Sequence, residues 1–174
     1  MKRIAILVLS LAVLGVGTAP RALALDGFYL GGHVGAVGPL GSGGNFNSGF
    51  GGGIELGFFA NPIVELRARG LFSSMGGTAP APAVRLIAGT LSGEFHILDV
   101  SDIELVIGAG PGFYSFNNGT SESVFGLQGG LELVMKLDEG IRIGFGFRAH
   151  APLSATIGST LFTALVSIGY QFGG

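Results

Sequence analysis

The ionisable residues with the most regular spacing in this chain alternate with apolar ones. Glu65, Arg67 and Arg69 occupy positions i, i+2 and i+4 of one run, and residues at that spacing share one face of a β-strand. Acidic and basic side chains on a common face can pair with one another. They must do so wherever water is excluded, because an unpaired buried charge is strongly destabilising. The pattern therefore favours ion pairing inside a β-structure.

Two other patterns suggest binding chemistry but lack the structural context for it. The segment GFGFRA at residues 144–149 matches a relaxed form of the dinucleotide-binding fingerprint. That fingerprint works at a turn that opens a helix, whereas here it lies within an alternating run and no helical pattern follows. His33, His96 and His150 belong to three separate runs, so we expect no metal site. We also expect no cofactor.

The elements that position these residues are β-strands, and the last of them is the clearest. Leu161–Phe172 reads LFTALVSIGYQF, with apolar side chains at every second position from Phe162 onward and mostly polar or small ones between them. Residues that rise about 3.3 Å each, in a strand tilted by about 45°, need about twelve positions to cross a hydrocarbon core of about 30 Å. A strand of this length and pattern is the unit of a transmembrane β-barrel.

The same alternation recurs along the chain and predicts eight strands. Longer connections rich in Gly, Pro, Ser and Asn, which favour turns, alternate with shorter ones. Both chain ends lie on the side of the short turns, which faces the periplasm in bacterial barrels. We therefore predict an all-β fold, a transmembrane up-and-down antiparallel β-barrel of eight strands. The expected strands cover residues 28–37, 47–60, 63–73 and 83–97, the segments between 102 and 117 and between 123 and 138, and residues 141–150 and 161–172.

The placement of the charges indicates which face of the barrel meets lipid. A soluble barrel carries its charges outside, but a basic group near the midplane of a lipid-facing surface costs about 2–4 kcal/mol. Five acidic and five basic residues share the non-apolar face of their expected strands. Because side chains just fill an eight-stranded barrel, we expect a plugged lumen held by an ion-pair network, with no wide pore. The network comprises Glu55, Glu65, Arg67, Arg69, Glu94, Glu104, Glu132, Lys136, Arg142 and Arg148.

Arg85 is the exception to this inward placement. It falls on the apolar face of the fourth expected strand, two residues inside its outer end. One interpretation is that its side chain snorkels to the headgroup region. The other is that it contacts the phosphates of lipopolysaccharide, and this is the functional hypothesis that we attach to it.

The first 24 residues have the pattern of a cleaved secretory signal peptide. Lys2 and Arg3 precede a mostly apolar run at residues 4–16, and Ala-Leu-Ala ends the segment. The run is shorter than the roughly 20 residues of a membrane-spanning helix. We therefore expect residues 1–24 to be a signal peptide and residues 25–174 to form one barrel domain in the bacterial outer membrane.

Composition agrees with an exported membrane protein. Three of the nine basic residues precede residue 25, which leaves six against eleven acidic ones, so nucleic acid is not an expected partner. The chain has no cysteine and cannot be held by disulfides. The complete backbone hydrogen bonding of a closed barrel would serve instead. Outer-membrane lipids and lipopolysaccharide are the expected partners, and we expect a monomer.

The chain resembles the small eight-stranded outer-membrane barrels, such as the transmembrane domain of outer-membrane protein A and its adhesin-like relatives. The resemblance rests on the signal sequence, on FYLGGHVG at residues 28–35 and on VSIGYQF at residues 166–172. It implies that Gly169, Tyr170 and Phe172 form a signal for the barrel-assembly machinery. No peptidoglycan-binding domain follows residue 174 in this sequence, so an anchoring role in the cell wall is not implied.

For function, the sequence favours a non-enzymatic barrel that supports envelope integrity or surface interaction. The first alternative is a narrow channel for small or hydrophobic solutes. The second is a lipid A-modifying enzyme, for which His150 and Ser154 would react and Glu122 or Glu132 would orient the histidine. Known deacylases place the histidine and serine closer together, and the acyltransferases have an amphipathic helix before their first strand. We therefore do not expect an enzyme.

Overall fold

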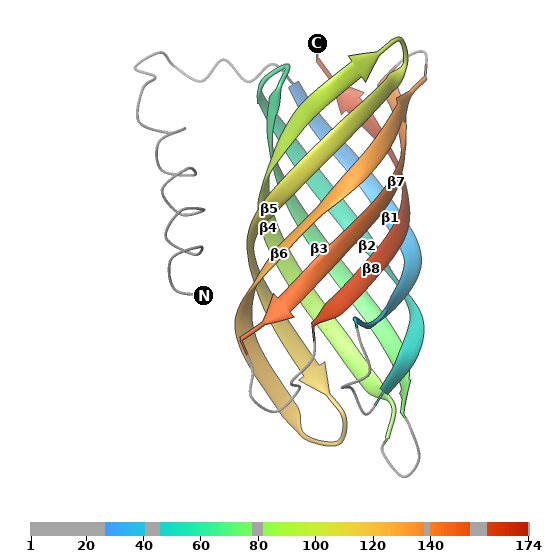
Figure 1. The fold of residues 1–174 in the computed structure, drawn as a ribbon, viewed down its shortest axis with the longest axis vertical. Coiled ribbons are helices and arrows are strands. Elements are labelled where there is room, and N and C mark those ends of the chain that lie inside the picture. Colours follow the sequence, from blue (N-terminus) through green and yellow to red (C-terminus); the bar gives the residue numbers. More distant parts are fainter. Residues whose placement is uncertain (1–26, 41–45, 78–81, 138–139, 154–159, 174) are drawn as a thin grey trace.

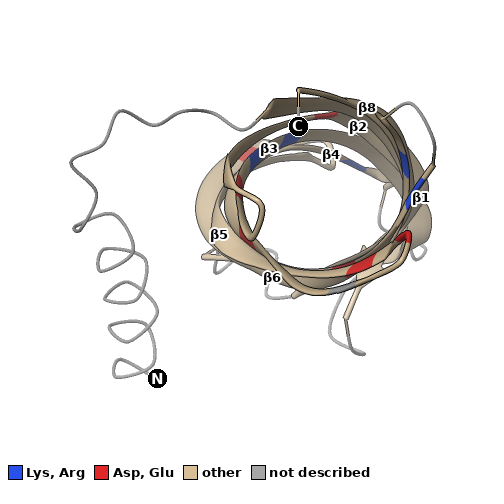
Figure 2. Ribbon diagram, turned by 90° about the horizontal axis from the view of Figure 1, so that it is seen from above, with Lys and Arg blue, Asp and Glu red and all other residues tan. Residues whose placement is uncertain are grey.

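Eight β-strands form one closed antiparallel barrel in the computed structural model (Figure 1). The strands follow one another around the ring in sequence order, and β1 pairs with β8 to close it. Figure 2 shows the closed ring from above. The structure describes residues 27–40, 46–77, 82–137, 140–153 and 160–173. The strands are β1 (Gly27–Pro39), β2 (Phe46–Asn61), β3 (Val64–Gly77), β4 (Val84–Val100), β5 (Ile103–Asn117), β6 (Ser121–Lys136), β7 (Ile141–Pro152) and β8 (Leu161–Phe172).

Side chains alternate between the two faces of the wall on every strand. On β3, Glu65, Arg67 and Arg69 are buried in the barrel. Leu66, which lies between two of them in the sequence, and Phe72, further along the strand, are exposed on its outside. The outer surface is therefore apolar, as a lipid-facing wall must be. All backbone groups in the wall can pair with a neighbouring strand because a closed barrel has no edge.

The two ends of the barrel differ in their connections. At the turn end, uppermost in Figure 1, lie the start of β1, the end of β8 and the connections β2–β3, β4–β5 and β6–β7. The Asn61 side chain closes the first of these turns, because its Oδ1 accepts hydrogen bonds from the backbone N–H groups of Ile63 and Val64 at 2.8 and 2.9 Å. The other four connections define the loop end, which faces the cell exterior when the turns face the periplasm.

The strands extend further toward the loop end than the alternation of polar residues suggests. The predicted loop at 74–82 is shorter, because β3 continues to Gly77 and places Met75 inside the barrel, where it is fully buried. Likewise β6 begins at Ser121, so Glu122 belongs to a strand rather than to a loop. On β3 the physical reason is that the loop half of the lumen is apolar, so the strand lacks the polar inner face that marked the other half. On β6 the first three residues are all polar and have the composition of a loop.

The predicted signal peptide, residues 1–24, lies outside the described residues and stays a prediction. Within the described segments, no helix is long and apolar enough to cross a bilayer.

Candidate functional site: the barrel lumen

The ten charged residues expected on the inner face all point into the lumen. Nine of their side chains are at most 7% exposed, and Lys136 at the turn end is 35% exposed. Each of the ten lies within 4 Å of an opposite charge. The equal numbers of acids and bases therefore correspond to physical pairing in a water-poor interior, which is the condition under which buried charges are tolerated.

Arg67 is the centre of this network. Its Nε and Nη2 donate to the two carboxylate oxygens of Glu65, each at 2.6 Å, in a bidentate pair on one strand. Its Nη1 donates to Oε2 of Glu132 at 2.7 Å. Because Glu132 belongs to β6, this bond crosses the lumen and ties opposite walls together. All five donors of a guanidinium point in a fixed fork, which suits it to this bridging role.

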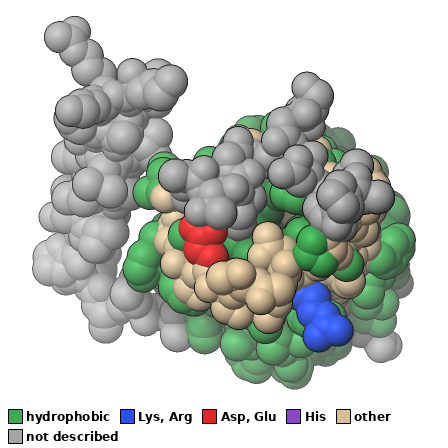
Figure 3. Space-filling model, turned by 90° about the horizontal axis from the view of Figure 1, so that it is seen from below, with side chains coloured by type: hydrophobic (Ala, Val, Ile, Leu, Met, Phe, Trp, Pro, Cys, Tyr) green, Lys and Arg blue, Asp and Glu red, His purple; other side chains and the backbone are tan. Residues whose placement is uncertain are grey.

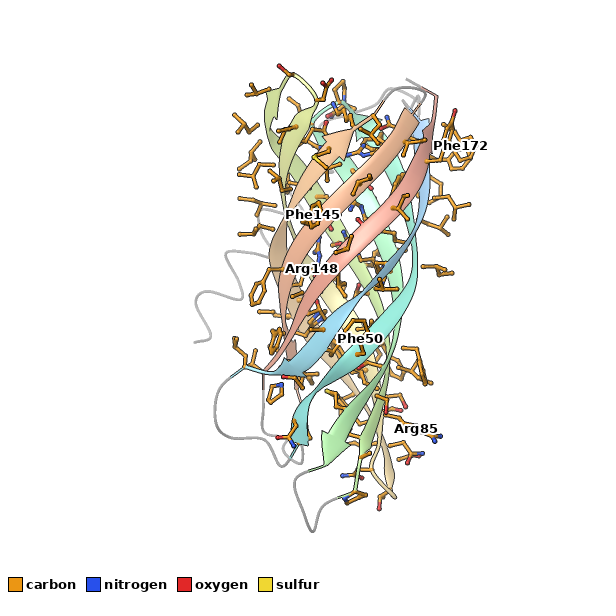
Figure 4. The ribbon with its side chains drawn as sticks, turned by 90° about the vertical axis from the view of Figure 1, so that its right-hand side faces the viewer. Phe50, Arg85, Phe145, Arg148 and Phe172 are labelled. Atoms are coloured by element: carbon orange, nitrogen blue, oxygen red, sulfur yellow. The ribbon has the colours of Figure 1, made fainter. Side chains whose placement is uncertain are left out.

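A second arginine on β3 extends the network toward the middle of the barrel. Arg69 donates to Glu55 at 2.9 Å, to Glu94 at 2.7 Å and to Glu132 at 3.0 Å. Glu94 also accepts from Nη2 of Arg148 on β7, at 2.7 and 2.8 Å. Figure 4 shows Arg148 at mid-height of the barrel. Charges from β2, β3, β4, β6 and β7 are thus joined in one layer.

Toward the turn end, Glu104 of β5 collects the remaining cations. It accepts from Arg142 at 2.5 Å and from Lys136 at 2.6 Å. His96 then lies between two carboxylates, with Nδ1 3.2 Å from Glu104 Oε2 and Nε2 3.2 Å from Glu65 Oε2. His96 therefore connects the turn-end group to the central group, and all ten charges form one continuous network.

Neutral polar residues complete the network, and the charge pattern alone did not single them out. The Tyr29 hydroxyl donates to Glu55 at 2.7 Å, and Ser167 donates to the second oxygen of Glu132 at 2.9 Å. Gln128 accepts from Arg148 at 2.9 Å. The available signal was their position, because each stands on the less apolar face of its strand.

The acidic side chains fit because glycines on neighbouring strands leave room for them. A Cβ atom added at any of three inward-facing glycines would overlap a carboxylate. Such an overlap forces the neighbour to move or the side chain to leave its pairing geometry. Part of the high glycine content, 34 residues, is therefore a packing requirement of the lumen. The pairs are Glu65 beside Gly57, Glu94 beside Gly108 and Glu132 beside Gly144.

The loop half of the lumen is filled by an apolar layer that the sequence reading missed. Met75, Leu86 and Leu161 are at most 1% exposed and stand on inward-facing positions of β3, β4 and β8. The signal for this layer was the unbroken strand parity from Glu94 back to Leu86. Other members are Val37, Phe46, Leu71, Val84, Ala88, Tyr114 and Phe116, with Val124 packed against them.

The histidine considered for catalysis belongs to the boundary between the two layers. His150 is buried, with Nδ1 3.1 Å from the Tyr114 hydroxyl and Nε2 3.1 Å from Thr163 Oγ1. Glu132 is engaged in the central network. Ser154 lies outside the described residues. The described partners of His150 are thus an aromatic hydroxyl and a threonine, which gives the imidazole a packing and hydrogen-bonding role in the lumen.

One small polar cavity remains within the charged layer. It has a volume of about 10 Å³ and is lined by His33, Glu55, Arg69, Glu132 and Arg148 among others. That volume accommodates about one water molecule. Neither ring nitrogen of His33 has a hydrogen-bond partner among the described residues, and a single water in this cavity would satisfy one of the two.

The sequence of residues 6–172 matches the family described as the outer membrane protein beta-barrel domain. The chain belongs to this family of outer-membrane β-barrels. A search of curated protein sequences finds no significant match. The match covers nearly the whole chain, so this outer-membrane barrel is located in the bacterial outer membrane.

Solved structures of other outer-membrane barrels share the fold at low sequence identity. Neisserial surface protein A, NspA, is 15% identical with a TM-score of 0.66, covering 83% of this chain and 97% of that one. OprG from Pseudomonas aeruginosa is 13% identical with a TM-score of 0.62, covering 86% and 97%. The N-terminal barrel domain of OprF from the same organism is 14% identical with a TM-score of 0.58, covering 85% and 98%.

The residues expected to guide assembly of this outer-membrane barrel lie on its closing strand. Phe172 stacks on Phe28 of β1, with ring centroids 4.4 Å apart and an interplanar angle of 9°, and Tyr170 packs edge-on against Phe172. Both rings are on the lipid side at the turn end. Gly169 faces inward, where an added Cβ would overlap the ring of Tyr29.

Proposed function

We propose that this protein is a closed, non-enzymatic outer-membrane barrel that supports envelope integrity or surface interaction rather than solute passage. The observation that carries the proposal is the double filling of the lumen. An ion-pair network occupies the turn half and the middle, and a layer of buried apolar side chains occupies the loop half.

Each layer opposes conduction for a different physical reason. A solute crossing the charged layer would have to separate cross-lumen pairs such as Arg67–Glu132 and leave buried charges unpaired, which is strongly unfavourable. An ion crossing the apolar layer would lose its hydration among side chains that offer no replacement. The cavity beside His33 within the charged layer, about 10 Å³, is the size of one water.

Single-channel recording in planar bilayers tests this proposal directly. The wild-type protein should give no discrete conductance steps under conditions in which a large-pore porin, reconstituted in the same way, does. A variant that thins only the apolar layer, Met75→Ala with Leu86→Ala, should also stay silent because the charged layer still closes the lumen. Discrete steps from the wild-type protein would overturn the proposal and favour the narrow channel.

The role in the envelope needs a cellular measurement. Cells that lack the protein should become more sensitive to detergent, and expression of the wild-type chain should restore their resistance. The mass of lipid A isolated from the two strains should be the same. A mass shift of an acyl group that depends on the protein would instead establish lipid modification.

A further inference from the structure

A groove crosses the lipid-facing surface of the barrel. Its volume is about 520 Å³, within the range of about 300–1,000 Å³ of small-molecule sites. It is a largely open hollow rather than an enclosed pocket, and it is lined almost entirely by apolar atoms. Large apolar side chains cover much of the outer wall, and this hollow lies between some of them.

One cross-strand row of residues creates the groove. In register, Ile54 of β2 pairs with Gly70 of β3, Gly70 with Gly89 of β4, Gly89 with Phe113 of β5, and Phe113 with Phe125 of β6. The two glycines form the floor. The ridge on the β5–β6 side consists of two aromatic rings, whose centroids are 5.3 Å apart.

A polar row lies nearer the loop end on the same face. Arg85 of β4 pairs in register with Ser74 of β3 and Asn117 of β5, and all three side chains are exposed on the outside. Arg85 precedes the floor residue Gly89 by four positions on one strand, a separation of about 13 Å at about 3.3 Å per residue. Among the described residues, Arg85 is the basic residue on the lipid-facing side, and Figure 4 shows it near the loop end, pointing away from the barrel.

We propose that this groove binds one lipid A molecule of the outer leaflet, with an acyl chain lying across Gly70 and Gly89 and a phosphate on Arg85. The chemistry is complementary at both ends. An apolar hollow accepts a hydrocarbon chain, and a guanidinium with neighbouring hydroxyl and amide groups suits a phosphate. Figure 3, a view from the loop end, shows a small group of basic side-chain atoms at the rim beside hydrophobic side chains.

The position of the site selects lipid A over other phosphate-bearing lipids. With the turns facing the periplasm, the loop end lies at the outer leaflet of the outer membrane, which is built from lipopolysaccharide. The inference requires only that the barrel spans that membrane, and it goes beyond the proposed function. A conducting lumen would contradict the proposed function and leave this site unaffected, because the groove is on the opposite face of the wall.

Two glycines on β4 offer a matched pair of variants. A Cβ added at Gly89 or at Gly93 meets no atom within 4 Å, so larger side chains at either position leave the barrel intact. Both glycines face outward, but only Gly89 lines the groove. Gly89→Leu therefore fills the site, and Gly93→Leu is its control. Arg85→Gln removes the charge and leaves the groove open.

Native mass spectrometry of the detergent-solubilised, full-length protein titrated with bisphosphorylated lipid A tests the site. The wild type and Gly93→Leu should retain one lipid A, and Gly89→Leu should bind it about tenfold more weakly. Arg85→Gln should bind about fivefold more weakly and lose its preference for lipid A over the dephosphorylated form. Faster gel migration of unboiled samples checks that each variant is folded.

Three results would overturn the proposal. Equal retention of lipid A by Gly89→Leu and Gly93→Leu would show that the groove is not part of the binding site. An undiminished preference of Arg85→Gln for the phosphorylated form would exclude Arg85 as the phosphate ligand. Equal retention of phosphatidylglycerol and lipid A by the wild type would show a general anionic lipid surface in place of a lipid A site.

Discussion

Arg67 of β3 and Glu132 of β6 meet across the lumen, with Nη1 2.7 Å from Oε2, although β4 and β5 separate their strands along the wall. A contact of this kind does not belong to the hydrogen-bonded ladder. It ties the two sides of the barrel through its interior, so the stability of the closed barrel should depend on it more than on any lipid-facing contact.

Removal of the shared carboxylate should therefore be costly. Glu132→Ala leaves Arg67 and Arg69 each without one buried acceptor, and breaking a buried pair from one side typically costs about 3–5 kcal/mol. We expect a loss of that size in the free energy of unfolding, measured by urea titration in detergent micelles. Leu133→Ala, on the lipid side of the same strand, is the control and should lose much less. A loss for Glu132→Ala that did not exceed the control would contradict the bridging role.

His96 should be less critical than Glu132, although it joins the two parts of the network. Glu65 keeps Arg67, and Glu104 keeps Arg142 and Lys136, when the imidazole is removed. His96→Ala should therefore cost about 1.5–3 kcal/mol, the net value of hydrogen bonds to charged groups, in the same urea titration. If it cost as much as Glu132→Ala, the turn-end group would depend on the histidine rather than on its own ion pairs.

The contact between Gly169 and Tyr29 should limit which residues the closing strand accepts. A Cβ at Gly169 would overlap the Tyr29 ring, so Gly169→Ala should destabilise the barrel by about 1–3 kcal/mol, as overpacking does. Gly169→Ala should cost nearly as much in a Tyr29→Phe background, which keeps the ring, and clearly less in a Tyr29→Ala background. Each double variant is compared with its own Tyr29 single variant, because that variant already lacks the hydrogen bond to Glu55. Gly93→Ala, which meets open space, is the control. If Gly169→Ala were as costly in the Tyr29→Ala background as in the wild type, the overlap with the Tyr29 ring would not be the cause of the destabilisation.

Variants of the aromatic pair that joins β1 to β8 distinguish a role in stability from a role in assembly. Phe28→Ala and Phe172→Ala remove the same stacking contact from its two sides, so both should lower the unfolding midpoint of refolded protein, Phe172→Ala somewhat more because it also loses the edge-on contact with Tyr170. If Phe172 is also read by the assembly machinery, only Phe172→Ala should show an additional defect in folded protein recovered from cell membranes. Equal recovery of the two variants from cells would mean that Phe172 acts through stacking alone.

The sequence predicted the features of this structure that depend on a single strand. Period-2 alternation located all eight strands, and the bounds of the last, Leu161–Phe172, agree with the structure. Alternation is a local property, because successive side chains on a strand must point to opposite sides. The same rule placed every charged side chain of the network in the lumen and Arg85 outside.

Contacts between strands could not be predicted in this way. The partners of Arg67, the bridging position of His96 and the row that aligns Gly70 with Gly89 depend on the register between strands and on closure of the ring. The inward position of Met75 was missed because an apolar inner face and an apolar outer face look alike in one strand. The sequence alone thus determined the strands, which face of each strand is polar, and the charge balance. The tertiary structure decided which charges pair, where the lumen becomes apolar and where the outer wall is hollow. These features depend on atoms that are brought together from distant strands.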